Sequence, residues 1–478
     1  MSWTWTQPPG SLQGLAGDAH RVSTERTRGK VSNLMMNRSH KGAAIVIVSL
    51  VLVAAGRAQD QASATPPTND AILHQMQELQ EEVKALRAEV TALKSTPAPA
   101  PAPAPAAAPP TEAVVASPSA PAAAPAPTGL AALLGPTTLS GFVDTYYGFN
   151  SNHPSNRQNG LRNFDVNTNQ FGLNMIELVA DKSVDNTSRL GYHVALGFGQ
   201  AMNMVNSASP TELGFDQYLK EGYLEYMAPI GKGLQINVGK FVTPAGAEVI
   251  ESKDNFNYSR GLLFSWAIPY FHFGASAKYA FNSKFAVTGY VVNGWNNSID
   301  NNTGKTVGFS AAWTPNAKFS IIETYLGGPE QSNDNKDWRH LSDTVITYNP
   351  TAKLSLVANY DYGHEDIGIA QERPFTVAKW SGLAGYVKYA PNDKWAVAVR
   401  GEYFDDNQGW STGTAQELSE FTATLQRTFA GKLISRLEFR RDMTDSRTFL
   451  RGPANTGVGG QNTAALGLIY AFSSADAK

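Results

Sequence analysis

The chain has 478 residues, of which 42% are hydrophobic and 17% charged, and its formal net charge is −2. A surface that binds nucleic acid needs a clear basic excess, so this charge argues against that class of partner. The chain has no cysteine, which excludes disulfides and thiolate metal sites. Its 42 glycines and its aromatic content of 10% favour many short strands joined by turns over a helical enzyme.

The N-terminal region has the pattern of a secretory signal. Residues 1–35 show no periodicity and are interpreted as an over-extended start. From Met36 a short basic segment precedes the apolar run 42–55, and Ala58 ends a stretch of small residues. We therefore predict a signal peptide over 36–58 that is cleaved after Ala58. The alternative is a membrane anchor, but an apolar run of fourteen residues is shorter than the roughly 20 residues that span a bilayer.

Residues 71–95 carry a heptad repeat, and a linker follows it. The apolar heptad positions are Ile72, Met76, Leu79, Val83, Leu86, Val90 and Leu93. Their alternating spacing of four and three predicts a coiled-coil helix, for which Val at a and Leu at d nominally favour a dimer. The alternative is a single helix packed on the surface of the domain that follows. Residues 96–136 are mainly Pro and Ala and predict a semi-rigid extended linker.

From residue 137 to 472 the pattern changes to the period of two that is typical of strands. Tight turns that end in Lys alternate with long polar loops rich in Asn, Asp, Gly and Ser. This sorting by length is typical of an up-and-down transmembrane β-barrel in a bacterial outer membrane. We predict an all-β antiparallel barrel of sixteen strands, followed by a short tail over 473–478. The predicted strands are 137–150, 169–183, 189–201, 217–228, 233–242, 268–281, 284–295, 305–314, 317–328, 340–349, 353–364, 375–390, 394–404, 417–430, 432–443 and 461–472.

Charged residues in two of the last strands share one parity, while apolar residues share the other. The charges are Arg400, Glu402, Arg436, Glu438 and Arg440. A charge that faces lipid at mid-depth costs several kcal/mol, roughly 2–4 for Arg. We therefore expect these five side chains to face the lumen. Taken singly, each Arg is more simply explained as a solvated lumen residue without a selective role.

The connection 243–267 is unlike the other loops, because it combines its length with acidic groups and large apolar residues. By order it is the third outward loop, and we expect it to fold into the lumen and narrow the pore. The predicted constriction residues are Glu248, Glu251, Asp254 and Arg260. The three acids would face the lumen arginines and set up a transverse field that screens solutes. The alternative is an ordinary extracellular loop with a hydrophobic patch.

Several short segments resemble a known family. They are GKFVTPAG at 239–246, NYSRGLLF at 257–264, PYFHFG at 269–274, SGFVDTYY at 140–147 and VVNGW at 291–295. These segments resemble the OmpL-like outer-membrane β-barrel porins, and the resemblance spans residues 137–472. It implies a bacterial outer-membrane porin with passive transport as its broad role, and it carries over no particular solute.

The sequence thus predicts a porin that passes small hydrophilic solutes or ions by diffusion. We expect no enzyme, no catalytic residue, no cofactor and no metal site, because no nucleophile frame, phosphate loop or dense His/Asp cluster stands out. The expected partners are outer-membrane lipid and further copies of the chain, as a trimer or a dimer. Two alternatives remain: an anion-selective channel, for example for phosphate, and a tether that contacts the cell wall through a periplasmic helix over 71–95.

Overall fold

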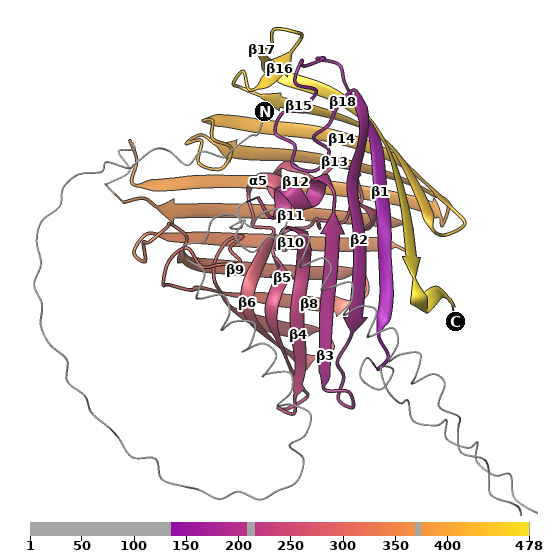
Figure 1. Ribbon diagram of the computed structural model, residues 1–478, viewed down its shortest axis with the longest axis vertical. Coiled ribbons are helices and arrows are strands. Elements are labelled where there is room, and N and C mark those ends of the chain that lie inside the picture. The colour runs from indigo at the N-terminus through magenta and orange to yellow at the C-terminus, as the bar shows by residue number, and fades with distance from the viewer. Residues whose placement is uncertain (1–134, 208–215, 369–373, 478) are drawn as a thin grey trace, which may run out of the picture. The chain divides into compact units, whose positions relative to one another are not determined.

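The computed structural model describes residues 135–207, 216–368 and 374–477. They form a closed antiparallel barrel of sixteen strands, in which each strand pairs with its neighbours in sequence and the last strand pairs with the first. Figure 1 shows the strands side by side in this order, with β1 next to β18. The predicted signal peptide, coiled-coil helix and most of the linker lie outside the described residues.

The predicted strand count is confirmed, and the observed bounds lie within a few residues of the predicted ones. The barrel strands are β1 (Thr138–Asn150), β2 (Gln170–Lys182), β3 (Leu190–Phe198), β4 (Leu219–Ala228), β5 (Leu234–Val242), β6 (Phe271–Asn282), β7 (Phe285–Val292), β8 (Thr306–Asn316), β9 (Phe319–Pro329), β10 (Trp338–Thr351), β11 (Leu354–Asp366), β12 (Val377–Asn392), β13 (Trp395–Asp406), β14 (Gln416–Phe429), β15 (Leu433–Thr444) and β18 (Gly460–Ser473).

The long loops contain short elements that the period-two pattern did not reveal. The second outward loop contains α4 (Gln200–Val205), and the third contains η3 (Ser252–Asp254) and α5 (Leu262–Trp266). The last outward loop forms a small hairpin from β16 (Phe449–Arg451) and β17 (Thr456–Val458). None of the helices among the described residues is long and apolar enough to span a membrane.

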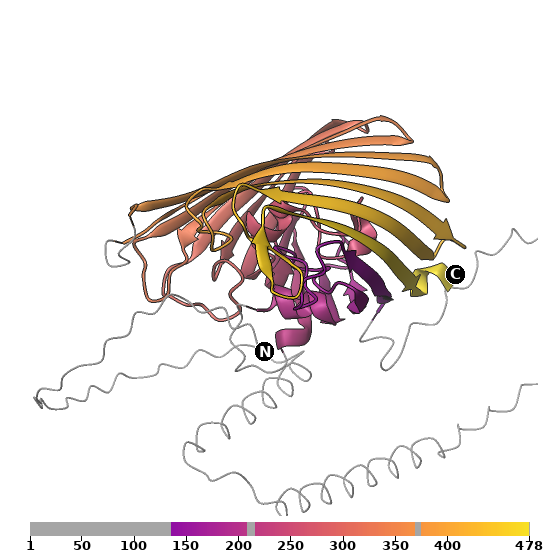
Figure 2. The same ribbon diagram turned by 90° about the horizontal axis from the view of Figure 1, so that it is seen from above.

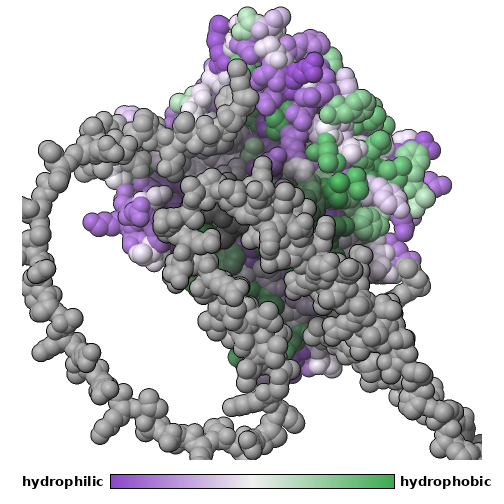
Figure 3. Space-filling model, in the orientation of Figure 1, coloured by the Kyte–Doolittle hydropathy of each residue, from purple (hydrophilic) through white to green (hydrophobic). Residues whose placement is uncertain are grey.

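Alternation along the strands separates an apolar outer face from a polar inner one. On β1, Tyr147 and Phe149 are exposed, whereas Asp144 and Tyr146 are buried. In β18, Leu466, Leu468 and Tyr470 share the exposed face, as an outer surface in contact with lipid requires. Figure 3 shows hydrophobic side chains gathered over the region of β1 and β18, and hydrophilic ones over the loop that carries β16 and β17.

Candidate functional site

The loop between β5 and β6, residues 243–270, lies inside the barrel. It is the third outward connection, as predicted, and its helix α5 contacts β12, β13 and β14 inside the ring of strands that Figures 1 and 2 show from two sides. Pro244 cannot continue the hydrogen-bond ladder of β5. Gly246 then turns the chain with a φ of 97°, where an added Cβ would come within 2.5 Å of Ile268. The sequence therefore forces the chain away from the wall directly after β5.

Arg436 on β15 holds the middle of this loop through backbone carbonyl groups. Its guanidinium donates to the carbonyl oxygens of Ser252 at 2.5 Å, Asn257 at 3.0 Å, Asn255 at 2.7 Å and Lys253 at 3.3 Å. A fifth hydrogen bond joins its Nε to a side chain of β14. An arginine can satisfy several carbonyl groups at once because its donors point outward in one plane. The segment 252–257 is thereby fastened to the inner wall.

Arg400 on β13 joins the loop to the wall by an ion pair. Its Nη1 lies 2.7 Å from Glu248 Oε1 on the loop, and its Nε lies 2.8 Å from Glu420 Oε1 on β14. The same guanidinium donates to the Ser259 carbonyl oxygen at 2.7 Å. The Arg400 side chain is 0% exposed, so it faces protein groups and no open water. Glu248 and Arg400 are thus in direct contact, whereas the sequence predicted that they face one another across the pore.

Two carboxylates of the wall accept backbone N–H groups of the loop. Glu438 on β15 accepts from Tyr258 N at 2.6 Å and from Ser259 N at 3.0 Å. Glu402 on β13 accepts from Leu262 N, at the start of α5. Carboxylates are favoured at such positions because the first N–H groups of a helix have no partner within it. These glutamates therefore bind the loop backbone and are buried by it.

The remaining predicted constriction residues occupy different surroundings. Glu251 forms an ion pair with Lys220 on β4, which also lies 2.5 Å from Glu177 on β2. Asp254 is paired with Lys253 at 2.5 Å, and its side chain is 53% exposed. Arg260 is buried, donates to the Tyr258 carbonyl oxygen at 2.9 Å and stacks over a phenylalanine of the first outward loop. Of the predicted set, Asp254 is thus the most open to the lumen.

Apolar packing fixes the end of the loop. Leu262, Leu263 and Phe264 of α5 are buried in the main hydrophobic cluster. Trp380 on β12 donates through Nε1 to the Ala267 carbonyl oxygen at 3.0 Å. The burial of these large apolar side chains stabilises the docked loop through the hydrophobic effect, in addition to the polar contacts of residues 248–260.

The first outward loop closes over the same side of the lumen. Arg162 lies 2.5 Å from Asp165 and 2.8 Å from Asp442 on β15. Burial alone would lower the pKa of Arg162, but the two carboxylates more than offset this and raise the pKa above its ordinary value. The arginine therefore stays charged and ties the loop to the wall.

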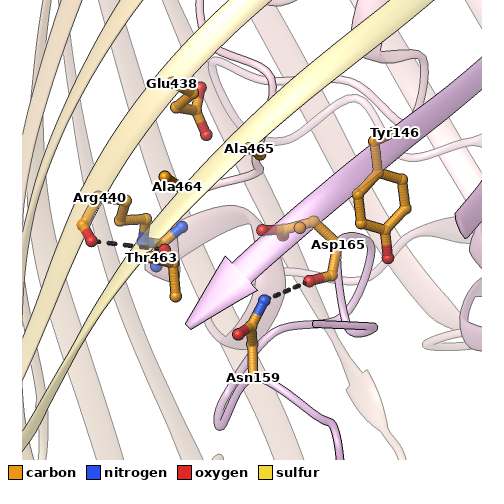
Figure 4. A pocket seen from close by; sticks show the side chains of 9 residues that line it. Tyr146, Asn159, Asp165, Glu438, Arg440, Thr463, Ala464 and Ala465 are labelled. Atoms are coloured by element: carbon orange, nitrogen blue, oxygen red, sulfur yellow. Dashed lines mark hydrogen bonds between the residues drawn. The ribbon is translucent and has the colours of Figure 1, made fainter. Parts of the chain in front are cut away.

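Figure 4 shows the small polar pocket where this loop meets β1 and β18. Tyr146, Asp165, Arg440 and Thr463 are among the residues that line it. Asn159 donates to the Asp165 carbonyl oxygen at 2.8 Å, and the Thr463 hydroxyl donates to the Arg440 carbonyl oxygen at 3.4 Å (Figure 4). Arg440 also donates to the Arg260 carbonyl oxygen at 2.7 Å. The arginine thus links the inward-folded loop to this corner of the barrel.

Sequence reasoning did not single out several residues that hold the loop. Asp144 on β1 accepts from Ser252 Oγ at 2.6 Å and from Tyr258 OH at 2.8 Å. Lys220 and Trp380, described above, also contact the loop. Strand parity would have placed Asp144 inside the barrel, because its neighbours Val143 and Thr145 belong to the outer face. Nothing in the sequence indicates the contact to a loop that follows a hundred residues later.

The chain was compared with known proteins. A family model described as "Putative beta-barrel porin-2, OmpL-like" matches residues 136–472. This chain belongs to that family. No curated protein matched it. The porin family places the chain in the bacterial outer membrane and makes it a porin, a water-filled barrel for passive passage.

Solved structures similar to this porin come from several bacteria. An anion-selective porin from Comamonas acidovorans is 12% identical with a TM-score of 0.49, and the match covers 70% of this chain and 99% of that one. OmpT, an outer membrane protein of Vibrio cholerae, is 13% identical with a TM-score of 0.45 and coverages of 70% and 97%. The outer membrane channel DcaP of Acinetobacter baumannii is 11% identical with a TM-score of 0.45 and coverages of 70% and 97%. The family assignment rests on the match to the family model alone.

Proposed function

We propose that residues 243–267 form the constriction of this porin and set its size and charge preference for small hydrophilic solutes and ions. The observation that carries the proposal is the burial of Arg400, Arg436 and Arg440 beneath this loop. Each of these side chains donates to loop carbonyl groups. A segment held by three separate arginines occupies its part of the lumen permanently and leaves solutes the remaining space.

The side of the loop that is turned away from these arginines supplies the proposed lining of the path. Val249 is 40% exposed, and Asp254 carries the most exposed of the predicted constriction side chains. On the opposite wall, Lys278 of β6 is exposed, and Asp181 of β2 is 31% exposed. Charges of both signs therefore line the proposed path, which suits a general pore for small polar solutes better than a strongly charge-selective one.

The burial of the arginines bears on the anion-channel alternative. A passing anion would need open guanidinium groups, but Arg400 and Arg436 are 0% and 1% exposed, and their donors already bind Glu248, Glu420 and loop carbonyl groups. These contacts favour a general pore over an anion filter built on these residues. A phosphate-selective channel would have to use other cations of the lumen.

The experiment is single-channel recording on the purified protein in planar bilayers. We expect an ohmic pore with weak ion selectivity, because exposed charges of both signs line the proposed path. Replacing Asp254 by Asn should shift the reversal potential in asymmetric salt toward anions, and Glu417→Gln, on the outer face, serves as the control. An unchanged potential in D254N, with the control also unchanged, would remove the loop from the constriction.

The assembly and the N-terminal extension complete the proposal. We propose that the porin forms a homo-oligomer in outer-membrane lipid and that the predicted helix over 71–95 extends into the periplasm, where it can contact the cell wall. The heptad repeat and the Pro/Ala linker support this arrangement. Deletion of residues 59–128 tests it, since unchanged envelope cohesion and unchanged oligomeric state would rule out both roles of the extension.

A further inference from the structure

Most of the outer face of the barrel is apolar, but a polar cluster lies in the middle of β9 and β10. Glu323 accepts hydrogen bonds from Ser342 Oγ at 2.7 Å and from Thr344 Oγ1 at 2.5 Å. We call these three residues the Glu323 cluster. Glu323 is the fifth of the eleven residues of β9, so the cluster lies well inside the strand and away from both rims.

Register and burial place the Glu323 cluster on the outside. Thr344 pairs with Glu323 on one side and with Tyr360 on the other, and Tyr360 is 47% exposed. The residues of opposite parity, Thr324 and Asp343, are both 0% exposed and belong to the lumen side. Because successive side chains in a strand point to opposite faces, Glu323 points away from the lumen.

The position of this carboxylate is unusual for a surface that faces lipid. Other outward-facing carboxylates, such as Asp405 and Glu417, lie one residue from a strand end, where headgroups and water are near. Acyl chains offer no donor to a carboxylate at mid-strand, and an ionisable group at this depth ordinarily has a protein partner. The hydroxyl groups of Ser342 and Thr344 supply one donor to each oxygen and leave the remaining acceptor sites for another molecule.

A row of small residues, called the trough below, runs beside the cluster on the same face. Ala358 of β11 pairs with Gly385 of β12, which pairs with Gly401 of β13. A Cβ at Gly385 would meet nothing within 4 Å, so packing within the barrel does not require a glycine there. Leu383 and Val387 flank Gly385 along β12 and are 56% and 44% exposed. Glycine inside a strand weakens it and often marks a place where another backbone approaches closely.

We infer that the outer face of β9–β13, with the Glu323 cluster and this trough, is where a second copy of the chain packs. A second barrel brings polar side chains to the carboxylate and fills the trough, whereas lipid does neither. The choice of a second copy rests on the heptad repeat over 71–95, which predicts that chains of this sequence associate with one another. The inference rests on the proposed homo-oligomer and is independent of the constriction, because it concerns the outer face only.

The first test measures lipid access in the purified full-length mature porin, reconstituted in vesicles that contain brominated lipid. The chain has no cysteine, so Gly385→Cys and Leu224→Cys each give one labelling site for a bimane fluorophore. Leu224 on β4 is 69% exposed and serves as the lipid-facing control. We expect the label at 385 to be quenched several-fold less than the label at 224. Equal quenching would mean that lipid covers the trough and would overturn the inference.

The second test measures oligomeric state by native mass spectrometry in nanodiscs, with heat-modifiable gel mobility as the check that each barrel is folded. Gly385→Phe fills the trough, Glu323→Lys alters the polar cluster, and Val194→Phe on β3 is the control on another part of the wall. We expect G385F and E323K to run as folded monomers while V194F keeps the oligomer. A monomeric wild type would overturn the proposed homo-oligomer and the inference with it, whereas an oligomer that persists in both trough and cluster variants would overturn the choice of this face alone.

Discussion

Replacement of Arg436 by Met tests how the inward-folded loop is held. Arg436 makes five hydrogen bonds, of which four end on carbonyl oxygens of the segment 252–257. A hydrogen bond to a charged group contributes about 1.5–3 kcal/mol. The four bonds share one guanidinium and do not add, so we take about 3–5 kcal/mol, which is the usual cost of breaking a buried charge contact.

At the lower end, about 3 kcal/mol corresponds to a roughly 100-fold larger population of the released segment. Native-state hydrogen exchange of the amides of 252–257 should therefore quicken by about two orders of magnitude in R436M. In planar bilayers the same variant should show larger current fluctuations, because a released segment moves within the lumen. The barrel should keep its heat-modifiable mobility, since the strand pairing of β15 does not involve this side chain.

Arg427→Met on β14 is the matched control. Arg427 pairs with Ser435 in the register, stacks over Trp395 and Phe429 near the periplasmic turn, and shares the outer face with Phe429. This variant should leave the exchange of 252–257 unchanged. If R436M shows the wild-type exchange rate while folded, the carbonyl contacts do not hold the loop, and the reasoning fails.

Three further predictions concern charge, packing and pH. Glu248 and Glu251 are held by Arg400 and Lys220 and are far less exposed than Asp254, so Glu248→Gln and Glu251→Gln should shift the reversal potential in asymmetric salt toward anions less than D254N does; a shift larger than that of D254N contradicts the proposed lining of the path. Trp380→Phe loses one hydrogen bond to the loop and should cost about 1 kcal/mol of stability in a denaturant titration; an unchanged midpoint contradicts the anchoring of α5. Glu330 directly follows β9 and accepts from Trp295 N at 2.7 Å, so it holds the loop 293–305. Burial raises the pKa of Glu330 from 4.5 to about 7. The folded loop therefore favours the neutral carboxyl of Glu330. This contribution to the stability of the loop is fully present below pH 4.5 and is lost as the pH rises through 7. The protection factors of the amides of 293–305, which correct for the intrinsic rise of exchange with pH, should fall over this range, and Glu330→Gln should abolish the fall.

The barrel was predictable because its physical signals are local. Alternation with a period of two, as in Leu466–Tyr470, marks a strand through residues that are neighbours in the sequence. The turns that end in Lys mark the connections in the same local way. Even the inward-folded loop could be recognised, since Pro244 ends a strand and a long mixed segment follows before β6. The strand bounds therefore differ from the predicted ones by only a few residues.

The contacts of the site were less predictable because they depend on register. Parity shows that Arg436 faces inward, but it does not show that four carbonyl groups of a distant loop meet its guanidinium. For the same reason we predicted that Glu248 faces Arg400 across the water-filled lumen, whereas the two side chains are in direct contact. Short helices such as α4 have too few turns to produce a periodic signal of their own.

Because β1 pairs with β18, the barrel can close only after its last strand has been added. Ser140 pairs with Ser473 at the closing seam, so the wall is incomplete until the last strand has been delivered. Two of the strands that hold the inward-folded loop, β13 and β15, follow the loop by well over a hundred residues. Contacts of such high sequence separation form slowly. Until these strands are in place, the loop carbonyl groups that the arginines bind in the folded barrel lack their guanidinium partners.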